Sequence, residues 1–233
     1  MRGCFSILIL AAGFILAAIW FGGPPLAGTV VEATLTGSGL SADELDVKVE
    51  ASVPMTLVAG RADRVTVNAT GVRWSGLRAG SMTLAIDDVD LFGRTAGRVE
   101  GRFDDAELGG LGGAPVPASI SISGPAAAAT TTVRIDRPTV ERLAAAAFQA
   151  EFGIRADTVA LVAPDEVRLG VAGQTLSARL EILPNGGVAA TSPLGTVALV
   201  TAASSLPLTL SGLTVGENGL ELTGTIDIAS LLD

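Results

Sequence analysis

The sequence contains no histidine and no tyrosine, and its only cysteine is Cys4. Without histidine, the chain lacks the most common general base and the most common metal ligand. A single cysteine excludes a disulfide within the chain, and Cys4 lies beside a long apolar segment, so the rest of the chain has no thiol nucleophile. Lys48 is the only lysine, and its position in an alternating run predicts a solvent-facing side chain. We therefore expect no enzymatic activity and no cofactor.

Aromatic residues are scarce, at 4% of the chain, and the net charge is −9. No segment concentrates Arg or Lys, and too few aromatic residues are present to stack on bases, which argues against a nucleic-acid partner. The acidic balance also argues against attraction to an anionic membrane as the main binding force. The core must be built from Val, Leu, Ile and Ala, a composition that favours β-strands.

One long uncharged run is present, FSILILAAGFILAAIWF at residues 5–21. As a helix it would span about 26 Å, slightly less than the hydrocarbon core of a bilayer. Arg2 precedes the run and the next cation is Arg61, which predicts an N-terminus inside and a body outside the cytoplasmic membrane. Its end, Ile-Trp-Phe rather than a small-residue cleavage site, favours an uncleaved single-pass anchor in residues 1–28. A cleaved signal segment, with a secreted body, is the alternative.

The body, residues 29–233, alternates apolar and polar residues over most of its length. Period-two alternation is typical of antiparallel strands with one solvated face. At Asp87-Asp88 the alternation changes phase, which predicts a β-bulge. The predicted strands lie at 45–50, 64–70, 82–91, 116–123, 130–136, 157–163, 166–172, 175–183, 196–202, 206–215 and 219–228.

Residues 138–153 have helical period instead. Val140, Leu143, Ala144, Ala147, Phe148 and Phe152 share one face of the predicted helix. Asp136 suits the N-cap, Pro138 the first turn and Gly153 the C-terminal cap. Four consecutive alanines make the helix thin, so it either packs closely on a sheet or leaves room beside it. The fold class we predict is α+β: a long curled antiparallel sheet that wraps one or two helices.

Two stretches of the body resemble each other. In GLSADELDVKVE, residues 39–50, Gly39, Ala42 and Asp43 match the Gly, Ala and Asp of GIRADTVALVA, residues 153–163, at an offset of 114. The alignment predicts two similar halves, 29–115 and 138–233, within one domain. Chance similarity in an Ala/Gly/Val-rich chain is the alternative, and residues 29–38 could form either a helix or a strand.

The segment VPMTLVAGRADRVTVNATGVRWSGLRAGSMTLAIDDVDL, residues 53–91, resembles the LmeA-like phospholipid-binding family of bacterial envelope proteins. Segments 134–160 and 219–232 resemble the same family, so the resemblance extends over roughly residues 39–233. It implies a fold similar to the tubular lipid-binding superfamily, a phospholipid or other acyl-chain ligand, and a role in maintaining the cell envelope. The weak helical signal in residues 29–38 departs from the family pattern.

A curled sheet over a thin helix predicts an elongated apolar trough for acyl chains. The alternative is a fully packed β-domain with a structural or interaction role, which would bind another envelope protein. The acidic clusters Asp87, Asp88, Asp90 and Asp104, Asp105, Glu107 lack the ligand spacing of an EF-hand, and a solvated strand end explains them better than a calcium site. The residues that we predict to line the trough or its mouth are Met82, Leu84, Ile86, Leu143, Phe148, Phe152, Trp74 and Phe92.

Overall fold

The structure is a computed structural model that describes residues 40–52, 61–74, 77–90, 93, 95–110, 113–201 and 208–227. The predicted anchor, residues 5–21, and the ambiguous segment 29–38 lie outside these residues. Within the described part, no helix is both long enough and apolar enough to cross a membrane.

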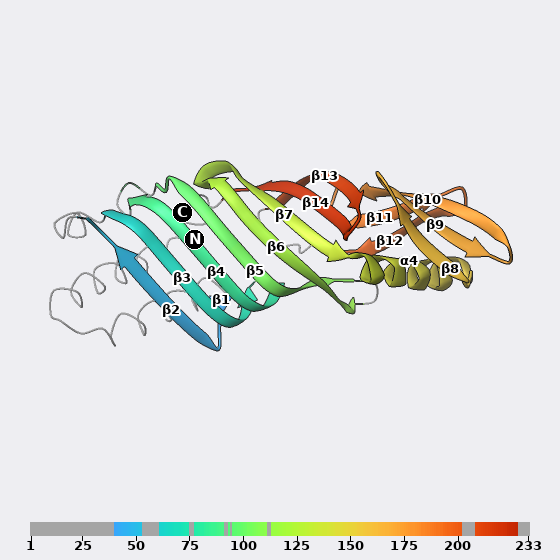
Figure 1. Cartoon of the computed structure of the whole chain (residues 1–233), viewed down its shortest axis with the longest axis horizontal. Helices are drawn as coiled ribbons and strands as arrows, with labels where there is room; N and C mark the ends of the chain where they lie inside the picture. The colour runs from blue at the N-terminus through green and yellow to red at the C-terminus, as the bar shows by residue number, and fades with distance from the viewer. Residues whose placement is uncertain are drawn as a thin grey trace. The chain divides into compact units, whose positions relative to one another are not determined.

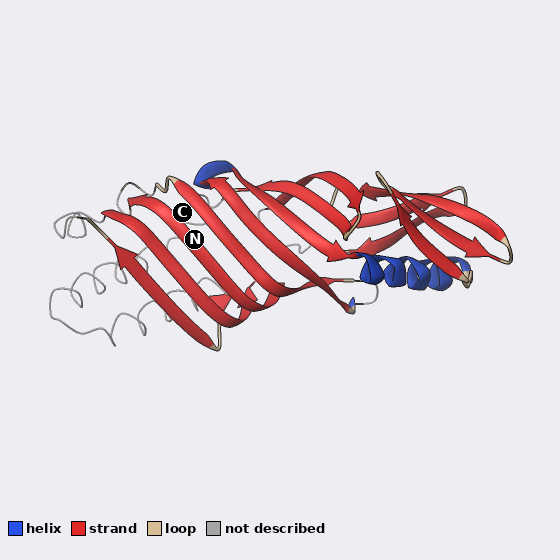
Figure 2. Ribbon diagram, viewed as in Figure 1, coloured by secondary structure: helices blue, strands red, loops and turns tan. Residues whose placement is uncertain are grey.

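Antiparallel strands dominate the described residues, with a single α-helix, as Figure 2 shows. This confirms the α+β class and the antiparallel sheet. The elements are β1 (Leu40–Ser41), β2 (Glu44–Glu50), β3 (Arg61–Trp74), β4 (Leu77–Asp90), β5 (Arg98–Gly109), β6 (Pro115–Pro125), η2 (Ala126–Ala128), β7 (Ala129–Asp136), α4 (Arg137–Phe152), β8 (Thr158–Val162), β9 (Glu166–Val171), β10 (Gln174–Ile182), β11 (Val188–Ser192), β12 (Gly195–Val200), β13 (Leu208–Gly216) and β14 (Gly219–Ile226).

The chain divides into two compact units. The first takes in residues up to 104, together with 121–130 and 226–233. Its sheet begins with β1 and β2, which pair with successive parts of β3, and continues through β4 to parts of β5 and β6 (Figure 1). β2 alternates exposed and half-buried residues along its whole length, as the sequence pattern predicts for a strand with one solvated face.

The predicted bulge at Asp87-Asp88 has a different form in the structure. Against β3 the register is unbroken, since Ala62 pairs with Val89 and Arg64 pairs with Asp87. Asp88 has a left-handed φ of 53°, and neither it nor the opposing Asp63 belongs to a paired step. Asp63 on β3 and Asp88 on β4 are therefore unpaired at the same position along the two strands. The change of phase therefore occurs on both strands together, and Ala62 and Val89 are both buried.

The second unit takes in residues 105–120 and 131–225. It contains parts of β5, β6 and β7 with β14 and β13, in the hydrogen-bonded order β5-β6-β7-β14-β13. It also contains a separate five-stranded antiparallel meander, in the order β12-β11-β10-β9-β8. Helix α4 contacts both edge strands of this meander, β8 and β12, and also β9. The helix therefore packs against both edges of the meander.

Helix α4 begins and ends within one residue of the predicted bounds. Asp136 is its N-cap, Pro138 lies in its first turn, and Gly153 ends it with a left-handed φ of 66° while its N–H donates to Gln149 O. The buried side chains are Thr139, Val140, Ala144, Ala147 and Phe148. Most of these belong to the predicted apolar face, so the periodicity identified the packed side of the helix.

Candidate functional site

Three rows of apolar side chains cross strands β2, β3 and β4 on one face of the first unit's sheet. The strand register places one residue from each strand in every row. We call these nine residues the apolar ladder: Leu45, Ala69 and Met82; Val47, Val67 and Leu84; Val49, Val65 and Ile86.

The ladder follows directly from the period-two sequence. Successive side chains of a strand point to opposite faces, so the residues between ladder positions form the other face of the sheet. Apart from Ala85, those residues are polar or charged, and Lys48 lies 3.5 Å from Asp46 there with 65% of its side chain exposed. The prediction that Lys48 faces solvent is confirmed.

Exposure varies along the ladder. Ala69 and Met82, in the first row, are buried, with 4% and 5% of their surface exposed. The remaining seven side chains are half-buried, although every one is an aliphatic residue of valine size or larger. The ladder therefore presents a continuous apolar surface without a hydrogen-bonding side chain. Such a surface can hold hydrocarbon and offers nothing to a polar ligand.

The predicted lining residues divide between the two units. Met82, Leu84 and Ile86 lie together in the ladder, whereas Leu143, Phe148 and Phe152 lie on α4 of the second unit. The side chain of Trp74 and the whole of Phe92 lie outside the described residues.

On α4, Phe148 is fully buried and belongs to the core of the second unit. Its ring lies 5.6 Å from that of Phe152, at an interplanar angle of 47°. Phe152 and Leu143 are half-buried, and Phe152 packs over Gly195, where an added Cβ would lie 3.2 Å from Cζ of the ring. Phe152 therefore packs the end of α4 against β12 of the meander.

Six ladder residues were not predicted as lining: Leu45, Val47 and Val49 on β2, and Val65, Val67 and Ala69 on β3. The sequence does mark each of them as the apolar side of an alternating strand. What the sequence alone does not provide is the register that sets these residues beside Leu84 and Ile86. The pairing of three strands, rather than a motif, creates the site.

Both acidic clusters lie on strands. Asp87 is 3.5 Å from Arg64, and Asp90 is 3.0 Å from Arg61. The second cluster lies in the last half of β5, where Asp104 is 2.7 Å from Arg102. These carboxylates are thus paired with arginines. Among the described residues, no group of three or more acidic, histidine or cysteine side chains could hold a metal ion.

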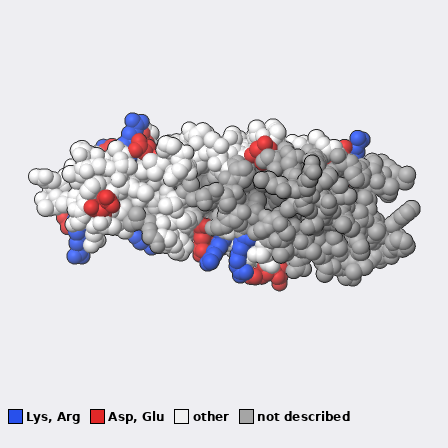
Figure 3. All heavy atoms as spheres, turned by 180° about the vertical axis from the view of Figure 1, so that it is seen from behind, with Lys and Arg blue, Asp and Glu red and all other residues white. Residues whose placement is uncertain are grey.

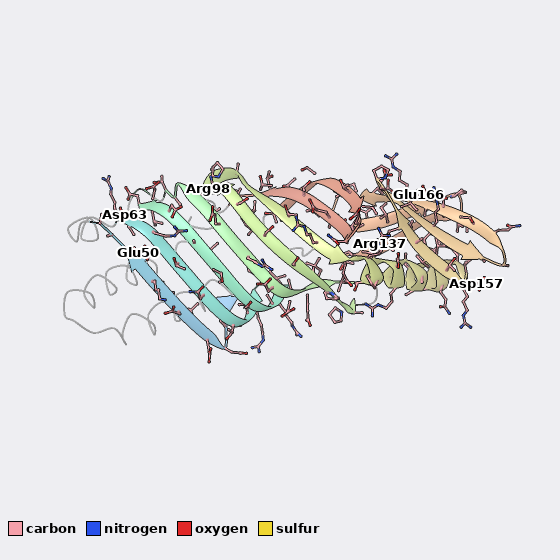
Figure 4. The ribbon with its side chains drawn as sticks, in the orientation of Figure 1. Glu50, Asp63, Arg98, Arg137, Asp157 and Glu166 are labelled. Carbon is pink, nitrogen blue, oxygen red and sulfur yellow. The ribbon has the colours of Figure 1, made fainter. Side chains whose placement is uncertain are left out.

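Two exposed carboxyls have perturbed acidity. The Ser52 hydroxyl and backbone N–H both donate to Asp63 and lower the pKa of that carboxyl. Hydrogen bonding by Arg168, and secondarily by Ser177, lowers the pKa of Glu166, while the pKa of Arg168 rises. Figure 4 labels Asp63 and Glu166. In each case the hydrogen bonds favour the ionised carboxylate.

Comparisons with known proteins return no relative. No protein family matches the chain, and no curated protein and no solved structure matches it.

Proposed function

We propose that the chain is an extracytoplasmic lipid-binding or lipid-shuttling protein of the cell envelope, held at the cytoplasmic membrane by residues 5–21. Its ligand is a phospholipid or another acyl-chain lipid. The binding is passive and needs no catalytic group.

The observation that carries this proposal is the half-buried state of seven aliphatic side chains in one continuous ladder. Each methylene of a ligand that leaves water against such a surface contributes about 0.8 kcal/mol. An acyl chain gains this energy at every carbon, whereas a polar metabolite gains little. The resemblance of residues 53–91 to a phospholipid-binding family covers β3 and β4, which supply six of the nine ladder residues.

A matched pair of substitutions on β4 tests the proposal. Leu84→Asp places a carboxylate in the middle row of the ladder, and Thr83→Asp places the same group on the opposite, solvated face. Residues 29–233 of each variant are purified, extracted with organic solvent for mass spectrometry, and titrated with a fluorescent phospholipid. We expect bound lipid in the wild type and in Thr83→Asp. We expect at least about a tenfold loss of affinity in Leu84→Asp, because a charge facing hydrocarbon costs more than 1.4 kcal/mol.

Thermal melting controls for folding, since both variants must remain folded for the comparison to hold. Wild-type protein that is free of lipid and does not bind the fluorescent phospholipid would contradict the proposal. That result would favour the alternative, a non-enzymatic structural or interaction domain that binds another envelope protein.

A further inference from the structure

Strand β2 lies at one edge of the first unit's sheet. Its inner side pairs with β3 along all seven residues, from Glu44 opposite Thr70 to Glu50 opposite Arg64. No described strand pairs with its outer side, and Figure 1 draws β2 at the outer border of this sheet. Alternate backbone N–H and C=O groups of an edge strand point away from its sheet, so β2 offers another strand a row of hydrogen-bonding groups.

The sequence of β2 does little to block such a strand. Edges that resist pairing carry a proline, a bulge, an inward charge or an unmatched lysine. β2 contains no proline, its register with β3 is unbroken, and its ladder side chains are all aliphatic. Lys48 is its one remaining obstacle. The position of this lysine therefore decides which strand can pair with the edge.

The charge pattern of β2 matches a second copy of β2. In an antiparallel pair centred on Val47, Asp46 of each copy lies opposite Lys48 of the other, and Leu45 lies opposite Val49. Opposed residues of an antiparallel pair share a face of the sheet. The aliphatic side chains therefore meet on one face, and two opposite-charge pairs form on the solvated face.

Other registers match the two strands less well. A shift by one residue sets the aliphatic side chains of one copy on the charged face of the other. A shift by two sets either Asp46 opposite Asp46 or Lys48 opposite Lys48. Only the centred register pairs the full length of β2, and its one unfavourable contact is Glu44 opposite Glu50 at each end. Arg64 lies opposite Glu50 on β3 and offsets that repulsion.

The charge of the whole chain permits this pairing. The net charge is −9, but repulsion between exposed charges is largely screened beyond about 8 Å at physiological ionic strength. In the view of Figure 3, the described acidic and basic side chains lie in mixed groups, with no patch of one sign. The short-range pairs at β2 therefore determine whether two edges match.

We propose that two copies of the chain pair through β2, edge to edge and antiparallel about Val47. The two apolar ladders then join, because Leu45, Val47 and Val49 of one copy continue into Val49, Val47 and Leu45 of the other. The apolar surface of each copy thus extends across three more strands. Backbone groups make this pairing and it needs no bound lipid, so it goes beyond the proposed function.

Cysteine cross-linking of the full chain tests the pairing and its register. Cys4→Ser removes the native thiol, and Val47→Cys introduces one at the proposed two-fold axis. Directly opposed Cα atoms are about 4.5–5.5 Å apart, within reach of a disulfide. The control is Val49→Cys on the same face of β2, where the two Cα atoms would be about 13 Å apart in this register. Both proteins are purified in detergent micelles and oxidised.

We expect at least about tenfold more disulfide-linked dimer with Val47→Cys than with Val49→Cys, because only the first pair of thiols is close enough to react. Equal amounts of linked dimer in the two variants would overturn the proposal.

Charge reversal on the same background tests whether the second copy is the occupant. Asp46→Lys sets lysine opposite lysine and Lys48→Asp sets aspartate opposite aspartate, so each lowers the linked fraction several-fold. The double reversal restores opposite charges and, with them, the original linked fraction. Both side chains are more than half exposed, so the fold tolerates these changes, which thermal melting verifies. Failure of the double reversal to recover linking would contradict the proposed pairing.

Failure of the pairing and failure of lipid binding are distinguishable. If both proposals hold, Leu84→Asp, two strands from the edge, removes extracted lipid and leaves the linked fraction of Val47→Cys unchanged. Asp46→Lys does the reverse, because Asp46 lies outside the ladder. Linked dimer in a chain that carries no lipid supports the pairing alone, whereas bound lipid without linked dimer contradicts the pairing alone.

Discussion

Two glycines flank the turn that joins β13 to β14, and they differ in the space that a side chain would have. Gly219 has a φ of 137°, and a Cβ added there would lie 2.6 Å from Arg137 N and closer still to Ile135 O. Gly216, at the other side of the same turn, has open space at its Cβ position. The sequence shows two similar glycines, and only the structure shows which of them permits a close backbone approach.

We predict that Gly219→Ala lowers the free energy of unfolding by about 2 kcal/mol or more, because strain at a positive φ adds to the clash with backbone atoms. Gly216→Ala is the control and should change stability by less than about 0.5 kcal/mol. Urea denaturation of both variants measures the difference. Equal stability of the two would show that the backbone at Gly219 relaxes without cost.

At the scale of elements, the sequence predicted a helix or strand correctly where one hydrophobic period continues along the whole element. Helix α4 has clear caps and a 3.6-residue period, and its bounds were predicted to within one residue. β11 was missed because Val188, Ala189 and Ala190 are all buried, so the strand has no alternation to recognise. β5 was missed although it alternates from Arg98 to Asp104, because Gly101 weakens its apolar side and Asp105, with a φ of 52°, shifts the phase.

Arg137 joins three elements through backbone carbonyls, and no sequence pattern marks it. From the start of α4 it donates to Leu161 O over 2.8 Å, Gly216 O over 2.8 Å and Glu217 O over 3.2 Å. Glu141 lies 3.6 Å from its guanidinium and also accepts the N–H of Leu161. The side chain thus ties the helix to β8 and to the turn that joins β13 and β14.

We predict that Arg137→Ala destabilises the protein by about 2–3 kcal/mol, since it removes three hydrogen bonds from a charged donor, partly offset by water. Arg142→Ala is the matched control, because among the described residues the hydrogen-bond partner of Arg142 is Thr139 of the same helix. We expect less than about 1 kcal/mol there. Thermal unfolding followed by circular dichroism compares the two. A loss in Arg142→Ala as large as that in Arg137→Ala would contradict the role of Arg137 in joining elements.

At the scale of the whole molecule, composition and alternation predicted the class of fold, whereas the ladder depended on a register that only the structure provides. The repeated stretches share one local feature: Asp43 N donates to Thr70 O over 2.8 Å, and Asp157 N donates to Gly170 O over 2.7 Å. Their strand pairing differs, because β2 pairs directly with β3 while β9 separates β8 from β10. Duplication of the two halves stays a prediction.

The predicted membrane anchor, residues 5–21, also concerns the whole molecule. We predict that the mature chain keeps residues 5–21, because the apolar run ends in bulky residues rather than a cleavage site. Intact-mass spectrometry of protein purified from membranes measures this directly. A mass that lacks about 27 N-terminal residues would contradict the anchor and would make the body a secreted protein.

The two-faced strands of the ladder also constrain how the chain can evolve. Alternate positions of β2 face either solvent or the apolar side of the sheet. We therefore expect the charged positions to accept substitutions more readily than the apolar positions. A one-residue insertion or deletion would exchange the two faces at once, exposing the aliphatic side chains and burying charge. Lineages that carry this fold should therefore vary β2, β3 and β4 by substitution and confine changes of length to the connections between them.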